Sequence, residues 1–181
     1  MRMPLNQMHI RTAESEQNNQ APGVTSKLSQ KASPLGGAFG MMRSSGHRPH
    51  QGWDLYAPVG SPVYAVSSGV VEFAEAHGDY GVQVCVRLGL RCGSDVDRLA
   101  AKSHAKYLYA FYAHLSSVLV RAGQTVQEGQ LIAFSGNSGN ASHTPPHLHF
   151  EIRTEARPGK GLRGRIDPGN VLGFQHYQCA V

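Results

Sequence analysis

Short apolar runs, most of them beside glycine or proline turns, are the feature that most limits what this chain can fold into. The 181 residues include 21 glycines and 10 prolines, so turns are frequent and long helices are disfavoured. Short apolar runs between such turns, several of them Val-rich, are typical of β-strands and hairpins, and they predict a single all-β domain of antiparallel sheets with long connecting loops. The runs are SPVYAVSSGVVEFAEA (61–76), YGVQVCVRL (80–88), YLYAFYAHL (107–115), SVLVRAGQTVQEGQLIAFSG (117–136) and PHLHFEIR (146–153).

Residues 1–36 differ in composition from the rest of the chain. They are polar, rich in Gln, Asn and Ser, and without hydrophobic periodicity, which indicates a flexible N-terminal tail before a folded domain over 37–181. No apolar run reaches the roughly 18 residues of a transmembrane segment. The start, MRMPLNQMHIRTAESEQNNQ, also lacks the apolar centre of a secretory signal. Either the chain stays in the cytoplasm, or it leaves by a route that needs no such signal, or a signal precedes the residues printed here.

The formal net charge of +5 is not gathered into one tract. A loose basic cluster follows the last apolar run, and we interpret it as a solvated loop rather than a surface for an anionic polymer such as nucleic acid or cell wall. Nucleic-acid binding is disfavoured because no recognition-helix, RRM or OB signature is present. The cluster comprises Arg153, Arg157, Lys160, Arg163 and Arg165.

The three cysteines and the polar segment 89–106 indicate little about function. Cys85 lies in the alternating run VQVCVRL and is expected to be a buried small apolar residue. A disulfide between Cys92 and Cys179 cannot be inferred from their spacing. Residues 89–106 are expected to form a long hairpin connection with one helical turn at DVDRLAAK.

The run PHLHFEIR alternates polar and apolar side chains. In a strand, successive side chains point to opposite faces, so the two kinds separate. Two imidazoles and a carboxylate on one face are costly to bury without partners, so the polar face needs an explanation. The apolar face would hold Leu148, Phe150 and Ile152, and the polar face His147, His149 and Glu151.

A second candidate group lies in HRPHQGWDLYAP (47–58). His50 and Asp54 are four residues apart, which brings them together on a strand or on a helix, and Pro49 and Gly52 argue against a helix. Imidazole nitrogen and carboxylate oxygen both bind zinc. His47 is a competing ligand. It is less favoured because it lies seven residues before Asp54, and residues an odd number apart point to opposite faces of a strand. Taken alone, the pair is better explained as a loop cap and a turn residue.

Together the two groups would form a zinc site with three protein ligands and a fourth position for water, as in catalytic zinc sites. Both histidines of HLH point to the same face of the strand and can reach this site, so alternation alone does not decide which of them binds zinc. The histidine of HLH that does not bind zinc and His114, in FYAHLSS, are candidates for non-ligand roles. Glu151 is a candidate for an outer partner that orients a ligand imidazole by a hydrogen bond. The candidate ligands are His50, Asp54 and one of His147 and His149.

Three spaced motifs resemble the lysostaphin-like, LytM-type zinc endopeptidases that cut peptidoglycan peptides. They are H-x-x-x-D at 50–54, YAHL at 112–115 and PHLHFE at 146–151. The intervening sequence is similar to that family in the family's order, and the resemblance covers about residues 37–170 without the tail. Two features depart from it: Pro145 stands where such enzymes often have glycine, and the 89–106 connection is longer than expected.

The resemblance implies a LytM/lysostaphin-type catalytic fold with one zinc ion and a role for each candidate residue. It makes His50, Asp54 and His149 the zinc ligands. It makes His114 and His147 the two non-ligand catalytic histidines, without deciding which is the general base. Loops 37–48, 89–106 and 135–146 would form the walls of an open cleft. His143 and Tyr80 are weak candidates for residues of these walls, and a surface role is favoured for both.

The implied function is hydrolysis of peptide bonds in peptidoglycan stem peptides or cross-links. The alternative is a catalytically weak LytM-like domain that binds cell wall and regulates another hydrolase, and the complete ligand set favours the enzyme. Peptidoglycan lies outside the cytoplasmic membrane, so the site of action would be the periplasm or the extracellular wall. An external substrate and the lack of a secretory signal are reconciled if the chain is an antibacterial effector. Such an effector is delivered by a specialised secretion apparatus, and an immunity protein guards the producer. A phage lysin or a trimmed sequence fits equally well.

Overall fold

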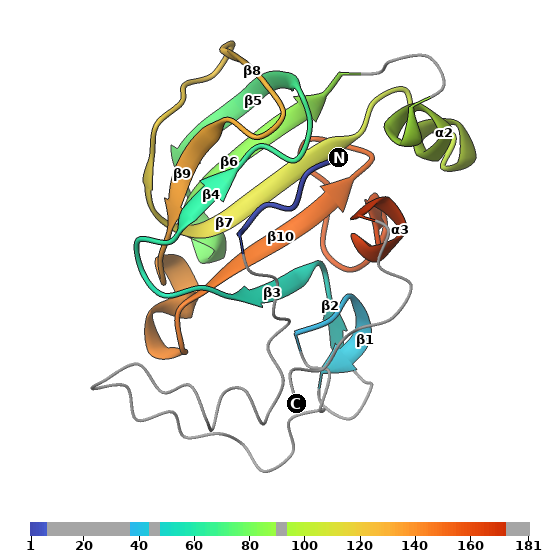
Figure 1. The fold of residues 1–181 in the computed structure, drawn as a ribbon. Helices are drawn as coiled ribbons and strands as arrows, with labels where there is room; N and C mark the ends of the chain where they lie inside the picture. Colours follow the sequence, from blue (N-terminus) through green and yellow to red (C-terminus); the bar gives the residue numbers. More distant parts are fainter. Residues whose placement is uncertain (7–36, 44–47, 90–93, 173–181) are drawn as a thin grey trace.

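The computed structural model describes residues 1–6, 37–43, 48–89 and 94–172, and it is mostly β (Figure 1). The described strands form a nine-stranded sheet and a separate two-stranded hairpin of β1 and β2. The strands are β1 (Gly40–Arg43), β2 (Arg48–His50), β3 (Trp53–Tyr56), β4 (Pro62–Tyr64), β5 (Gly69–Ala76), β6 (Val82–Leu88), β7 (Tyr109–Val118), β8 (Thr125–Val126), β9 (Leu131–Ser135), β10 (His147–Arg153) and β11 (Arg165–Ile166). The described helices are η1 (Gly78–Tyr80), α2 (Asp95–Lys102), η2 (Gly139–His143) and α3 (Gly169–Leu172).

The large sheet follows the order β11-β10-β7-β6-β5-β8, with β3 paired to β10, β9 to β7 and β4 to β9. Each of these pairings is antiparallel. The prediction of an all-β fold with antiparallel pairing is therefore confirmed. Strand β10 lies between β7 on one side and β3 and β11 on the other, which places the HLH motif inside the sheet (Figure 1).

Strand β10 separates the two faces as its alternation predicts. Leu148, Phe150 and Ile152 belong to the main hydrophobic core, where the Phe150 ring packs against that of Tyr112. Every residue of β10 is buried, including those on the polar face. That polar face therefore belongs to an enclosed site and not to a solvated surface.

The first six residues differ from the expected flexible tail over 1–36. The Arg2 N–H donates to the Val66 carbonyl at 2.8 Å, and the Tyr64 N–H donates to the Pro4 carbonyl at 2.9 Å. Leu5 lies in the main core and is 4% exposed. Burial of apolar side chains and backbone hydrogen bonds beside β4 explain why residues 1–6 are ordered. Residues 7–36 lie outside the described part of the chain.

The connection between β6 and β7 contains a helix longer than the single turn expected. Helix α2 covers Asp95–Lys102, and the Ser94 hydroxyl caps it by accepting from the Asp97 N–H at 3.1 Å. Cys85 is buried as predicted. Cys92 and Cys179 lie outside the described residues. Of the helices that are described, none has the length and apolarity to cross a membrane.

Candidate metal centre

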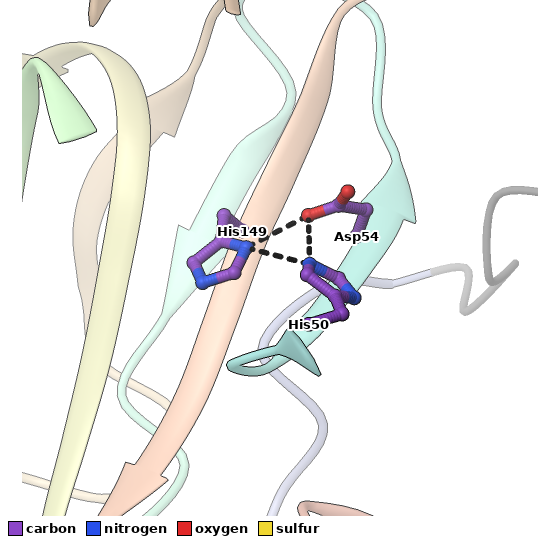
Figure 2. A group of neighbouring side chains, drawn as sticks. All are labelled: His50, Asp54 and His149. Carbon is purple, nitrogen blue, oxygen red and sulfur yellow. Dashed lines mark hydrogen bonds and ion pairs between the residues drawn. The ribbon is translucent and has the colours of Figure 1, made fainter. Parts of the chain in front are cut away.

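Three side chains from three strands converge on one point (Figure 2). His50 ends β2, Asp54 lies in β3 and His149 in β10. The antiparallel register pairs Asp54 directly with His149, so their side chains emerge on the same face of the sheet. All three are at least 96% buried, with exposed fractions of 3%, 2% and 4%.

The three potential donor atoms form a compact triangle. His50 Nε2 lies 3.1 Å from Asp54 Oδ1 and 3.3 Å from His149 Nδ1. His149 Nδ1 lies 2.7 Å from Asp54 Oδ1. Zinc bonds of about 2.0–2.1 Å in tetrahedral geometry separate the ligand atoms by about 3.3 Å. The residues present therefore fit a zinc ion, with small outward movements of Asp54 and His149.

Hydrogen bonds on the far side of each imidazole select which nitrogen faces this triangle. His50 Nδ1 donates to the Ala38 carbonyl at 2.8 Å, because a carbonyl oxygen can only accept. His149 Nε2 lies 2.9 Å from Glu151 Oε1 and donates to that carboxylate. The ring nitrogens left for a metal are then His50 Nε2 and His149 Nδ1. Such outer hydrogen bonds are the usual way in which proteins orient metal-binding imidazoles.

The electrostatics of the triangle favour a positive charge at its centre. Burial raises the pKa of the Asp54 carboxyl, but the charges of His50 and His147 and the hydrogen bonds from His149 and His50 outweigh it, so the pKa lies well below its usual value. Burial lowers the pKa of His149, but hydrogen bonds to Asp54 and Glu151 outweigh this, so the pKa is raised. A buried carboxylate surrounded by imidazoles suits a divalent cation as well as protons.

His147 lies beside the triangle on the same face of β10. Its Nδ1 donates to the Pro145 carbonyl at 2.8 Å, so Nε2 is the proton-accepting nitrogen of the neutral ring. That Nε2 lies 3.6 Å from Asp54 Oδ1. The structure thus distinguishes the two histidines of HLH, which parity alone could not: His149 lies within the triangle and His147 next to it.

His114 reaches the site through a bulge in β7. Pairs Val82↔Leu115 and Val84↔Tyr112 leave one residue of β6 opposite two of β7, and His114 has a φ of 59°. Strict alternation would have put His114 on the core face with Tyr112. The bulge instead turns it toward His147, with the two ring centroids 4.9 Å apart. Strained backbone conformations of this kind cluster at functional sites, although His104, after α2, also has a positive φ.

Ser138 supports this bulge from the loop before β10. Its carbonyl accepts from His114 Nδ1 at 2.9 Å, which leaves Nε2 as the proton-accepting nitrogen of the neutral ring. Its hydroxyl donates to the Leu115 carbonyl at 2.7 Å and accepts from the Val82 N–H at 2.9 Å. The hydroxyl therefore bridges the two strands where the bulge separates them.

Glu151 lies behind His149 and is fully buried. It contacts Tyr80 and two arginines, Arg153 and Arg165, as well as the His149 imidazole. Burial raises the pKa of Glu151, but hydrogen bonding and charge from His149 and Arg153 outweigh this and hold it well below its usual value. The expectation that the basic cluster is a solvated loop is therefore wrong for Arg153 and Arg165, whose side chains are 4% and 3% exposed. Arg157, Lys160 and Arg163 are exposed as expected.

The structure brings together all six residues singled out from the sequence as ligands, catalytic histidines or outer support. Tyr80 is half-buried with its hydroxyl on Glu151, whereas His143 is exposed. His47 lies outside the described residues. Sequence reasoning missed Ser138 and the two arginines. Parity within HLHFEIR would have placed Arg153 on the polar face, but no sequence signal places Arg165 there.

Comparison with known proteins gives a family match. The sequence profile of Peptidase family M23 matches residues 48–160. The peptidoglycan DD-endopeptidase ShyA of Vibrio cholerae is 35% identical over 118 residues, which cover 65% of this chain and 23% of ShyA. The DD-carboxypeptidase/endopeptidase Mpg of Neisseria gonorrhoeae is 36% identical over 111 residues, which cover 61% of this chain and 21% of Mpg. The chain thus spans about a quarter of the length of these relatives.

Solved structures agree with the sequence comparison. The catalytic domain of the antimicrobial peptidase lysostaphin from Staphylococcus simulans superposes with a TM-score of 0.54 at 27% identity. The match covers 69% of this chain and 80% of that domain. The described fold is therefore shared with a peptidase domain over most of that domain's length.

Proposed function

Because the chain belongs to peptidase family M23, we propose that it is a zinc-dependent endopeptidase that hydrolyses peptide bonds in peptidoglycan stem peptides or cross-links. The family match confirms the resemblance drawn from the three motifs. The substrate class is supported by relatives that are named peptidoglycan endopeptidases. The single observation that carries the proposal is the buried triangle of His50 Nε2, Asp54 Oδ1 and His149 Nδ1.

In this proposal His50, Asp54 and His149 hold one zinc ion. Zinc in such a site supplies a Lewis acid that polarises a carbonyl group and lowers the pKa of water. The protein's part is to fix the three donor atoms, and it does so through the Ala38 carbonyl and the Glu151 carboxylate. Burial of the site also strengthens every electrostatic interaction within it.

His114 and His147 act as the general base and general acid of the reaction. Each holds its Nδ1–H on a backbone carbonyl, of Ser138 and of Pro145 respectively, which fixes the tautomer with Nε2 as the basic atom. One of the two accepts the proton of the attacking water. The other, when protonated, donates a hydrogen bond to the oxyanion of the tetrahedral intermediate and then a proton to the leaving amine.

The alternative function is a wall-binding module that regulates another hydrolase without cutting. Such a module needs the fold but not a complete set of donor atoms. Here the three donors and both flanking histidines are present, and their hydrogen bonds to the backbone fix the nitrogens that a reaction needs. This supports the enzyme.

Digestion of purified peptidoglycan tests the proposal. The zinc-loaded protein is expected to release soluble fragments with new amino and carboxyl termini at peptide bonds, identified by mass spectrometry. Stripping the metal with a chelator is expected to abolish release, and adding zinc back to restore it. Binding to peptidoglycan with no cleavage, by a protein that contains zinc, would instead support the regulatory module.

The same proposal places the activity in the periplasm or in the extracellular wall, because that is where peptidoglycan lies. Expression directed to the periplasm of a Gram-negative host is expected to lyse the cells, whereas cytoplasmic expression is expected to be harmless. The matched control is periplasmic expression of His149→Ala. Equal toxicity of the wild type in both compartments, or of the variant in the periplasm, would contradict this placement. Delivery by a specialised secretion apparatus and protection by an immunity protein would be sought only after lysis is seen.

A further inference from the structure

We infer that Arg153, Arg165 and Tyr80 are positioning residues for the zinc site, acting through Glu151 on the third ligand, His149. We call these four residues the Glu151 clamp: Tyr80, Glu151, Arg153 and Arg165. The inference rests on the proposed function, since it concerns how tightly and in what orientation the same site holds its metal.

Both oxygens of Glu151 have two partners each. Oε1 accepts from His149 Nε2 at 2.9 Å and lies 2.6 Å from the Tyr80 hydroxyl. Oε2 accepts from Arg153 Nε and from Arg165 Nε, each at 2.7 Å. Four short contacts fix the plane of the carboxylate, and through it the direction of the His149 ring.

The arginines are themselves held in place. Arg165 Nη1 donates to the Gly159 carbonyl at 2.7 Å and to the Gly161 carbonyl at 2.9 Å. Arg153 Nη1 donates to the Ala156 carbonyl at 3.2 Å, and its guanidinium lies 3.4 Å from the centre of the Phe111 ring. The β10–β11 register pairs the two arginines with each other. The clamp therefore connects the zinc site to the loop 156–161 and to β11.

Stability alone does not explain this arrangement. Replacing a buried ion pair by apolar side chains of similar size is often neutral or stabilising. Outer partners of metal-binding imidazoles, by contrast, typically change metal affinity by about 10–100-fold when they are mutated. The division of Arg165 between Glu151 and two carbonyls also needs the forked guanidinium, which a lysine ammonium cannot reproduce.

Zinc affinity of clamp variants tests the inference. The variants are Arg165→Met, Arg165→Lys and Tyr80→Phe, with Arg163→Met as the matched control because Arg163 is an exposed arginine of the same segment. The zinc Kd is measured by competition with a chromophoric chelator, and thermal unfolding of the metal-free proteins is followed in parallel. We expect Arg165→Met to weaken zinc binding about 10-fold or more, as outer-partner mutations typically do. Arg165→Lys should weaken it less, and Arg163→Met should bind like the wild type.

Tyr80→Phe removes only a hydroxyl and keeps the ring that packs edge-on against Phe111, so it is the variant best able to fold. It too should bind zinc more weakly than the wild type. Wild-type zinc Kd in Tyr80→Phe and Arg165→Met overturns the inference, and so does a lower unfolding temperature with an unchanged Kd, since the role is then structural only. A wild-type protein that binds zinc but cuts no peptidoglycan overturns the proposed function alone. A wild-type protein that binds no zinc overturns both.

Discussion

The His149→Ala variant is expected to lose bound zinc and hydrolytic activity together. His149 supplies one corner of the donor triangle, with Nδ1 at 2.7 Å from Asp54 Oδ1 and 3.3 Å from His50 Nε2. Its removal leaves two protein ligands, fewer than the three that catalytic zinc sites use. It also leaves Glu151 Oε1 without the imidazole that it orients. We therefore expect the zinc content to fall from one ion per chain to near zero after dialysis, and peptidoglycan release to fall to background.

Metal analysis by inductively coupled plasma mass spectrometry, beside the digestion assay, measures this result. The matched control is His77→Ala, which removes an exposed histidine from the turn after β5 and should leave zinc and activity unchanged. Retention of a full zinc ion by His149→Ala would show that the ligand set is wrong.

Variants of His114 are expected to separate zinc binding from catalysis. His114 lies beside the triangle and not in it, with its ring centroid 5.8 Å from that of His149. Removing its imidazole should therefore leave the zinc Kd close to that of the wild type. Because general acid–base catalysis contributes about 10²–10⁴-fold, we expect kcat to fall by that factor.

The substitution at His114 is chosen for its φ of 59°. Alanine is strained at that backbone angle, whereas asparagine tolerates it and can still donate to the Ser138 carbonyl. His114→Asn should fold and bind zinc like the wild type and still lose turnover. Equal loss of metal in His114→Asn and His149→Ala would mean that His114 is itself a zinc ligand.

The fold and the residues that cluster around the donor triangle followed from local patterns. Alternation within HLHFEIR separates a core face from a polar face, and that alternation is a backbone property that any strand obeys. The H-x-x-x-D motif gave two more side chains, His50 and Asp54, whose even spacing lets both reach one site. The pairing of Asp54 with His149 across β3 and β10 then completes the triangle, and it depends on a strand register that no local pattern contains.

The features that the sequence did not predict all depend on departures from regular pairing or on distant contacts. His114 has the parity of a core residue, and only the bulge opposite β6 turns it to the site. Arg165 lies in a basic, glycine-rich segment that resembles a solvated loop, and only the β10–β11 hairpin buries it. Leu5 lies in the stretch 1–36, whose composition as a whole is polar, and its burial accompanies backbone hydrogen bonds to Tyr64 and Val66.

The central claim is that one zinc ion is held by His50 Nε2, Asp54 Oδ1 and His149 Nδ1, with His147 and His114 beside it. An anomalous-scattering map collected at the zinc absorption edge from crystals of the zinc-loaded protein tests this most directly. We expect one strong peak per chain within about 2.0–2.2 Å of those three atoms. A peak bonded to Nε2 of His147 or His114 in place of any of them, or no peak between β2, β3 and β10, would contradict it.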